Sequence, residues 1–316
     1  MTDLLSQNKK LIINSDIDGV LSGLLLSNFL NCLVVGFSNS DHTVWIDKSK
    51  VPSIYDAVYI DLFVAHPRVC CIDQHIVSVN ERHHQLLKNN PRKVNPNFDN
   101  PRFHLPNHSY YNKYPFGTIH YLIAMLEAEG VKVDLNWMNP VGSIKFIDYL
   151  LRADDAMQTT VDSNYQANAA SWWNWLAQKS GNAASIYSLR NYLANLNGVQ
   201  VRAIKQTTTA TLTHPSLFSC SSPDGGYKSI ADPSGKLLPK VIQYIQFLAK
   251  ASGLTCFDLN LTLSPQIGRV NRLSLTSNQM EELIHQNTLN EESIFSYAFV
   301  RSANRGENFS YTIMEP

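Results

Sequence analysis

Short apolar runs alternate with helical patterns in the first half of the chain. Four runs have the length of buried strands and lie at residues 11–13, 33–37, 57–60 and 69–72. Apolar residues recur at helical spacing over residues 20–32, and helices are also expected over residues 116–129 and 141–151. Short apolar strands separated by helices are typical of a mostly parallel sheet with helices on both faces. We therefore predict an α/β fold for this half.

The second half of the chain has a different pattern. Helical stretches over residues 167–179 and 183–195 predict a connector, after which the chain becomes rich in Thr and Ser. One helix is expected over residues 238–251, and strands are expected over residues 295–300 and 309–314. The whole pattern predicts three parts: an α/β domain over residues 1–160, a helical connector over 161–204 and a smaller α+β domain over 205–316.

Composition narrows the classes of function. In 316 residues, 44% apolar content is ample for a core, and 16% charged content argues against a disordered chain. The formal net charge of +0 favours a small or short phosphorylated substrate, because proteins that bind long nucleic acid usually carry a basic surplus. No stretch resembles a signal peptide or has the length of a membrane span. We therefore expect a cytoplasmic protein with no membrane contact.

Acidic residues follow three of the four apolar runs. Asp16 and Asp18 follow the first run, Asp61 follows the third, and Asp73 and His75 follow the fourth. The carboxyl ends of parallel strands share one edge of a sheet, where ligands bind. Carboxylates gathered at one edge repel each other unless a cation such as Mg²⁺ or Mn²⁺ neutralises them. Aspartates after strands also form turns and helix caps, but their recurrence on consecutive elements favours a metal site.

The order and spacing of these residues resemble the DHH phosphoesterase superfamily, which includes RecJ-type exonucleases and nanoRNA phosphodiesterases. The resemblance covers about residues 10–156. The motifs that carry it are Asp16-Ile17-Asp18-Gly19 before an apolar helix, Asp61 after Val58-Tyr59-Ile60, Asp73-Gln74-His75, Phe116-Gly117-Thr118 at the start of a helix, and Asp154 within Arg152-Ala153-Asp154-Asp155.

The resemblance implies a set of metal ligands. Asp16 and Asp61 would bind a first ion of Mn²⁺ or Mg²⁺, and Asp18, Asp61 and Asp154 would bind a second. Asp155 and Asp148 remain alternatives to Asp154 as the last ligand. Asp61 would bridge the two ions, and Asp73 would support the end of its strand rather than bind metal.

The resemblance also implies catalytic and substrate contacts. His75 would contact the scissile phosphate and, with Asp61, would form the catalytic pair. Ser22 in the first motif is a further predicted substrate contact. Arg301 and Arg305, between the last two predicted strands, could hold a phosphate, although their pattern favours solvated arginines of a turn.

Two positions depart from the family pattern. Ile12 stands where the family has a metal-binding histidine, and Gln74 replaces the first histidine of the naming motif. Gln74 can still offer an amide oxygen to the metal, but this is a weaker ligand than imidazole for Mn²⁺. Asn14 could partly replace the ligand missing at Ile12. We therefore expect one or two bound ions.

The sequence predicts a metal-dependent phosphodiesterase that uses metal-activated water. Its substrate would be a nucleotide, a short oligonucleotide or a single-stranded nucleic-acid end, and its C-terminal domain could also bind a protein partner. One alternative is a haloacid dehalogenase-like phosphatase, because Asp16-Ile17-Asp18-Gly19 also resembles the opening motif of that class, with Asp16 as nucleophile. Another is a catalytically inactive DHH-like protein that binds nucleotide or acts as a scaffold.

Overall fold

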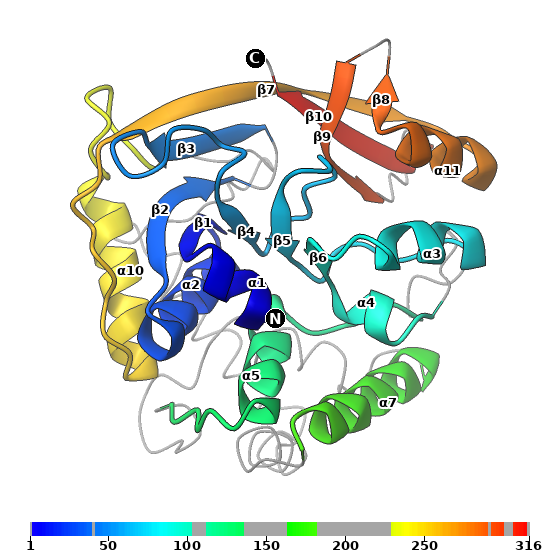
Figure 1. The fold of residues 1–316 in the computed structure, drawn as a ribbon, viewed down its shortest axis with the longest axis horizontal. Coiled ribbons are helices and arrows are strands. Elements are labelled where there is room, and N and C mark those ends of the chain that lie inside the picture. Colours follow the sequence, from blue (N-terminus) through cyan, green and yellow to red (C-terminus); the bar gives the residue numbers. More distant parts are fainter. Residues whose placement is uncertain are drawn as a thin grey trace. The chain divides into compact units, whose positions relative to one another are not determined.

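The computed structural model describes residues 2–39, 42–102, 112–135, 163–181, 229–289, 292–299 and 306–314. The chain has an α/β fold (Figure 1). It divides into two compact units. The first unit comprises Met1–Asn14, Val34–Tyr114 and Thr262–Pro316, and the second comprises Ser15–Leu33 and Pro115–Leu261. The predicted boundaries after residues 160 and 204 lie outside the described residues, so the three-part division stays a prediction.

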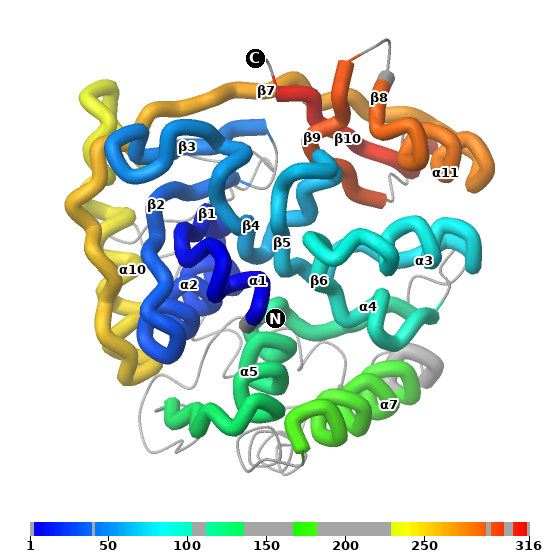
Figure 2. The backbone as a smooth tube through the Cα atoms, viewed as in Figure 1, coloured from blue at the N-terminus to red at the C-terminus, as the bar shows by residue number. Residues whose placement is uncertain are grey.

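A sheet of ten described strands has the order β6-β5-β4-β1-β2-β3-β7-β10-β9-β8. The strands are β1 (Lys10–Asn14), β2 (Leu33–Ser38), β3 (Thr43–Asp47), β4 (Val58–Ile60), β5 (Cys70–Ile72), β6 (Lys93–Val94), β7 (Leu263–Leu273), β8 (Thr288–Leu289), β9 (Glu292–Phe299) and β10 (Phe309–Met314). The C-terminal strands therefore extend the sheet that the N-terminal strands begin. The long strand β7 makes this connection by pairing with β3 on one side and β10 on the other (Figure 2).

The sheet as a whole is mixed, and the predicted parallel pairing is found in one part of it. Strands β1, β4, β5 and β6 pair in parallel. All the pairings from β2 through β3, β7, β10 and β9 to β8 are antiparallel. The short connection between β2 and β3 explains part of the difference, because parallel strands need a crossover of a dozen or more residues. The sequence did not predict β3, nor β7, where a proline, a glycine and polar residues interrupt the apolar pattern.

Three of the four parallel strands, β1, β4 and β5, match predicted apolar runs, whereas β6 was not predicted. All three residues of β4 are buried, as are Leu11, Ile12 and Ile13 of β1. Strands buried on both faces have nearly continuous apolar sequences, and this is the signal that predicted them. Helices α1 (Thr2–Gln7), α3 (Glu81–Lys88), α4 (Pro96–Asp99) and α11 (Ser277–Gln286) belong to the same unit.

Helix α3 carries two adjacent histidines, His83 and His84, within a charged sequence. Both side chains are buried, since α3 packs against α11 and the ring of His83 lies 6.2 Å from that of Phe299. Burial lowers the pKa of His83 to about 4, and its Nδ1 accepts a hydrogen bond of 3.1 Å from the amide of Val79. His83 is therefore a neutral residue of the packed interior.

The second unit consists of helices in its described part. Helix α5 (Thr118–Ala128) packs against both α2 (Ile17–Leu30) and α7 (Ser163–Lys179), and α10 (Pro239–Ser252) packs against α2. Trp172 and Trp173 of α7 are buried, and the ring of Trp173 meets that of Phe116 edge-on at 4.7 Å. These tryptophans therefore serve packing. Among the described helices, none combines the length and the apolar content needed to cross a bilayer.

Candidate functional site

The carboxyl edge of the four parallel strands carries one polar residue on each strand. The last residues in register are Ile13, Ile60, Ile72 and Val94. The residues that follow them are Asn14, Asp61, Asp73 and Asn95, which are 2%, 1%, 0% and 2% exposed. Backbone hydrogen bonds continue past the strands, because the amide of Asp61 donates to Ile72 and that of Asp73 donates to Val94. Four buried polar groups thus form a row on one edge.

Asp61 is held in an unusual backbone conformation. Its φ angle of 62° lies in the left-handed region, which costs a residue other than glycine about 1–2 kcal/mol. Such conformations persist where the surrounding structure fixes them, often at functional sites. The side-chain amide of Asn14 donates a hydrogen bond of 3.3 Å to Oδ2 of Asp61. The Asp61 carboxylate is therefore positioned by two neighbouring strands.

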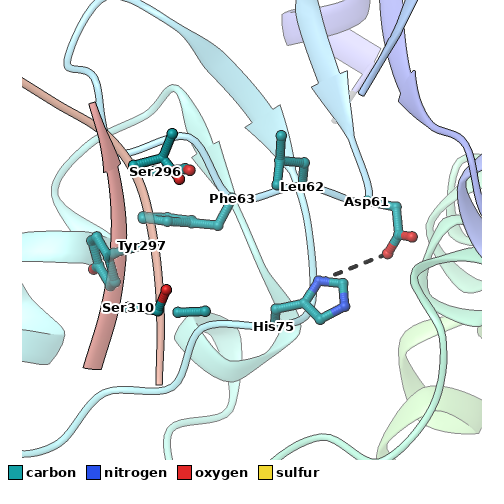
Figure 3. A pocket seen from close by; sticks show the side chains of 9 residues that line it. Asp61, Leu62, Phe63, His75, Ser296, Tyr297 and Ser310 are labelled. Carbon is teal, nitrogen blue, oxygen red and sulfur yellow. Dashed lines mark ion pairs between the residues drawn. The ribbon is translucent and has the colours of Figure 1, made fainter. Parts of the chain in front are cut away.

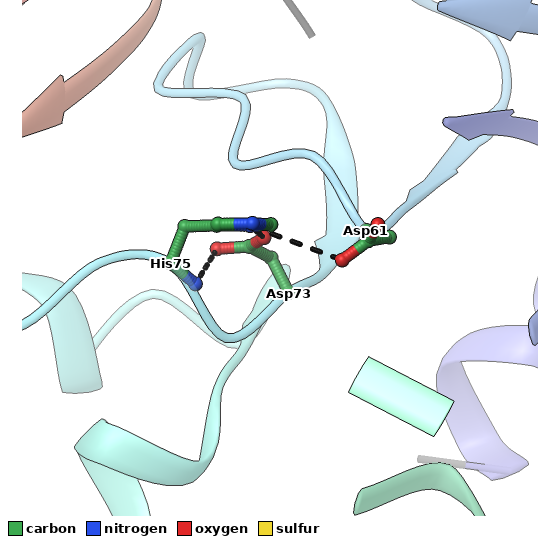
Figure 4. A group of neighbouring side chains, drawn as sticks. All are labelled: Asp61, Asp73 and His75. Atoms are coloured by element: carbon green, nitrogen blue, oxygen red, sulfur yellow. Dashed lines mark hydrogen bonds and ion pairs between the residues drawn. The ribbon is translucent and has the colours of Figure 1, made fainter. Parts of the chain in front are cut away.

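Asp73 holds the side chain and the backbone of His75 together. Oδ2 of Asp73 accepts from the His75 amide at 2.7 Å, and Oδ1 lies 2.5 Å from Nδ1 of the ring. An ionised carboxylate can only accept, so Nδ1 carries the proton in this arrangement and Nε2 remains for another partner. Nδ1 also lies 3.9 Å from Oδ1 of Asp61, so the three side chains converge (Figure 4). The His75 side chain is 35% exposed, whereas both carboxylates are buried.

The convergent side chains suit a divalent cation. Asp61, Asp73 and His75 each offer a ligand atom, and these atoms all lie within 4.8 Å of one another. Two buried carboxylates this close repel each other, and a cation between them would remove that cost. Carboxylate oxygens are the ligands that Mg²⁺ and Mn²⁺ prefer, and an imidazole nitrogen adds affinity for transition metals. Asp61 and His75 are thus brought together as predicted site residues, with Asp73 as a third member.

A pocket of about 110 Å³ adjoins this cluster. Asp61 and His75 lie on one side of it, with Ser296, Tyr297 and Ser310 of β9 and β10 on the other (Figure 3). Sequence reasoning missed these strand residues. The sequence of β9 and β10 alternates regularly between small and aromatic residues. This pattern does not reveal that the segment after Asp61 lies against these strands.

Ile12 and Gln74 occupy the altered positions of the family pattern. Ile12 is fully buried in the hydrophobic core of the sheet. Asn14, two residues further on the same face of β1, makes the contact with Asp61. The side chain of Gln74 is 1% exposed, and its buried Nε2 has no hydrogen-bond partner within the described structure. Gln74 as a metal ligand stays a prediction.

Asp16 and Asp18 belong to the second unit, where both bind backbone amides. Asp16 caps helix α2 and accepts from the amide of Gly19 at 2.9 Å. Asp18 is fully buried, and its two oxygens accept from the amides of Thr118 at 2.7 Å and Ile119 at 2.9 Å at the start of α5. These contacts leave lone pairs on both carboxylates, so metal binding by Asp16 and Asp18 stays a prediction.

The other predicted site residues have varied placements. Ser22 is buried within α2, and its hydroxyl has no hydrogen-bond partner in the described part of the chain. The remaining residues lie outside the described residues: Asp148, Asp154, Asp155, Arg301 and Arg305. Their predicted roles stay predictions.

Comparison with protein-family models, with curated proteins and with solved structures found no match to this chain. The polar side chains at the carboxyl edge of the sheet are therefore the observation from which a function can be inferred. Their chemistry can be tested residue by residue.

Replacing Asp18 by alanine is expected to lower the free energy of unfolding by about 2 kcal/mol, because two buried amides at the start of α5 lose their acceptor. Urea unfolding in the presence of chelator measures this effect without a contribution from metal. The exposed Asp56 provides the control as Asp56→Ala. An unchanged unfolding midpoint for Asp18→Ala would show that the cap does not stabilise the fold.

Proposed function

We propose that this chain is a phosphoesterase that depends on a divalent cation. Its substrate would be a nucleotide, a short oligonucleotide or a single-stranded nucleic-acid end. The observation that carries the proposal is the convergence of Asp61, Asp73 and His75 beside a pocket. Buried carboxylates with an adjacent, partly exposed imidazole combine a cation site with a group able to transfer protons.

Each side chain has a distinct role in this proposal. Asp61, with Asn14 as its hydrogen-bond partner, would be the central cation ligand. A cation bound there would neutralise charge on a phosphoryl oxygen and make water a better nucleophile. Asp73 orients the ring of His75 by accepting from Nδ1, which leaves Nε2 to exchange a proton with the substrate or with water. Asp73 is thus a positioning residue and His75 a catalytic one.

The start of α2 bears on the choice between enzyme classes. An apolar helix begins at Ile17, directly after Asp16, which supports the DHH-like interpretation. A dehalogenase-like enzyme would instead have a flap after the nucleophile, and it would give no role to Asp61, Asp73 or His75. Asp16 also already caps α2 through its side chain. The cation-dependent mechanism therefore accounts for more of the described residues.

Turnover assays test the proposal. Purified protein is incubated with Mn²⁺, with Mg²⁺ or with chelator against labelled single-stranded DNA and RNA, dinucleotides and a generic phosphodiester. We expect cleavage that requires the cation and that falls by about 10²-fold or more in Asp61→Asn, with Asp56→Asn as the matched surface control. Nucleotide binding without cleavage under any cation would favour the inactive scaffold. A phosphoryl group trapped on Asp16 would favour the dehalogenase-like enzyme.

A further inference from the structure

The pocket beside Asp61 and His75 has a floor of small side chains. Ser296 and Ala298 lie on one face of β9, and Ser310 and Thr312 lie on the same face of β10. The antiparallel register pairs Ser310 with Ala298 and Thr312 with Ser296. Four small side chains, three of them with a hydroxyl group, therefore form one continuous patch.

The pocket is open because small residues alternate with aromatic ones along β9 and β10. The residues between the small ones are aromatic, and their rings pack together, with Tyr297 and Phe309 stacked at 5.5 Å. The small residues leave about 110 Å³ open, which is more than three times the ~30 Å³ that one water molecule occupies. Pockets for whole ligands of drug size begin at about 300 Å³. The pocket thus fits one moiety of a nucleotide rather than all of it.

The segment after Asp61, which forms another side of the pocket, is hydrogen-bonded to β9 and packs against it. The segment after Asp61 contributes Leu62 and Phe63 to the lining. Its amide at Ala65 donates a hydrogen bond of 2.6 Å to Phe295 of β9, and the rings of Phe63 and Tyr297 meet edge-on at 4.9 Å. Phe63, the small side chains of β9 and β10, and the Asp61–His75 pair therefore belong to one packed arrangement.

The chemistry of the lining matches a sugar. Each hydroxyl group can donate one hydrogen bond and accept others, which complements the vicinal hydroxyls of ribose. The Phe63 ring offers an apolar surface for the C–H face of the sugar. We propose that the pocket binds the ribose of a nucleotide whose phosphate lies at Asp61 and His75, so that the enzyme prefers ribonucleotides to deoxyribonucleotides. This inference rests on the proposed phosphoesterase function.

The preference is measured as the ratio of kcat/KM for a diadenylate ribodinucleotide to that of its 2′-deoxy counterpart. We expect a ratio of about 10 to 100, because the missing 2′-hydroxyl leaves buried hydroxyl groups without a partner. Ser310→Ala and Ser296→Ala are expected to reduce the ratio at least threefold by weakening the ribose substrate alone. Ser293→Ala, at an exposed position of the same β9, is the matched control and should keep the wild-type ratio.

Two results would overturn the proposal in distinguishable ways. Equal cleavage of both dinucleotides by the wild type would reject ribose recognition and leave the phosphoesterase in place. If no phosphodiester is cleaved, calorimetry with adenosine 5′-monophosphate and its 2′-deoxy form decides the question directly. Binding at least threefold tighter for the ribose form, lost in Ser310→Ala, would support the subsite without the activity, whereas equal affinities would reject it.

Discussion

Replacing His75 by glutamine is expected to lower kcat about 10²- to 10⁴-fold while KM changes little. Glutamine keeps much of the size and polarity of the side chain but cannot transfer a proton at the position of Nε2. A group that acts only in the transition state affects kcat and kcat/KM equally, and this split separates catalysis from substrate binding. Steady-state kinetics with saturating cation on the substrate preferred by the wild type measures the effect.

Two further variants control for structural effects at His75. His285→Gln changes an exposed histidine on α11 and should leave kcat unchanged. Asp73→Asn tests the positioning role, because an amide can donate to Nδ1 and so favour the opposite tautomer. We expect a clear fall in kcat for Asp73→Asn as well. Wild-type kcat in His75→Gln would exclude His75 from the chemical step.

Replacing Lys93 by methionine is expected to lower the free energy of unfolding by about 4 kcal/mol. The Nζ atom of this buried residue donates to the carbonyls of Val64 at 2.5 Å, His66 at 3.0 Å and Val69 at 2.6 Å. The contacts with Val64 and Val69 are buried, and the same burial lowers the pKa of Lys93. Methionine would fill similar space but would leave three carbonyls without their donor.

Lys93 also supports the candidate site, because the three carbonyls that it binds belong to the segment between β4 and β5 that begins at Asp61. Urea unfolding monitored by tryptophan fluorescence measures the change. Lys88→Met alters an exposed lysine at the end of α3 and should change the free energy of unfolding by less than about 0.5 kcal/mol. Equal unfolding midpoints for the two variants would contradict the structural role of Lys93.

The parts of the fold that could be predicted are those whose signal is local. Strand β10 was expected over residues 309–314 and spans Phe309–Met314, because its apolar residues mark it. Helix α2 was expected over residues 20–32 and begins three residues earlier, at Ile17, because Asp16 caps it. The polar residues at the ends of β4 and β5 were identified for the same reason, since each directly follows an apolar run.

The parts that could not be predicted depend on pairings between distant segments. Strand β7 pairs with β3, which lies more than two hundred residues earlier, and its sequence, interrupted by Pro265 and Gly268, gives little local signal. The row that includes Asn14 and Asn95 appears only once the parallel register is known. The burial of His83 is not evident from the charged sequence of its helix, because it depends on the packing of α3 against α11. The pocket likewise requires β9 and β10 to meet the segment after Asp61.

The most direct test of the cation site is a titration of the protein with Mn²⁺, followed by the electron paramagnetic resonance signal of the free ion. Wild-type protein and Asp56→Asn are expected to bind Mn²⁺ with the same affinity. Asp61→Asn is expected to bind at least about tenfold more weakly, because it loses a charged central ligand. Equal Mn²⁺ binding by wild type and Asp61→Asn, or no binding by the wild type, would contradict a cation site centred on Asp61.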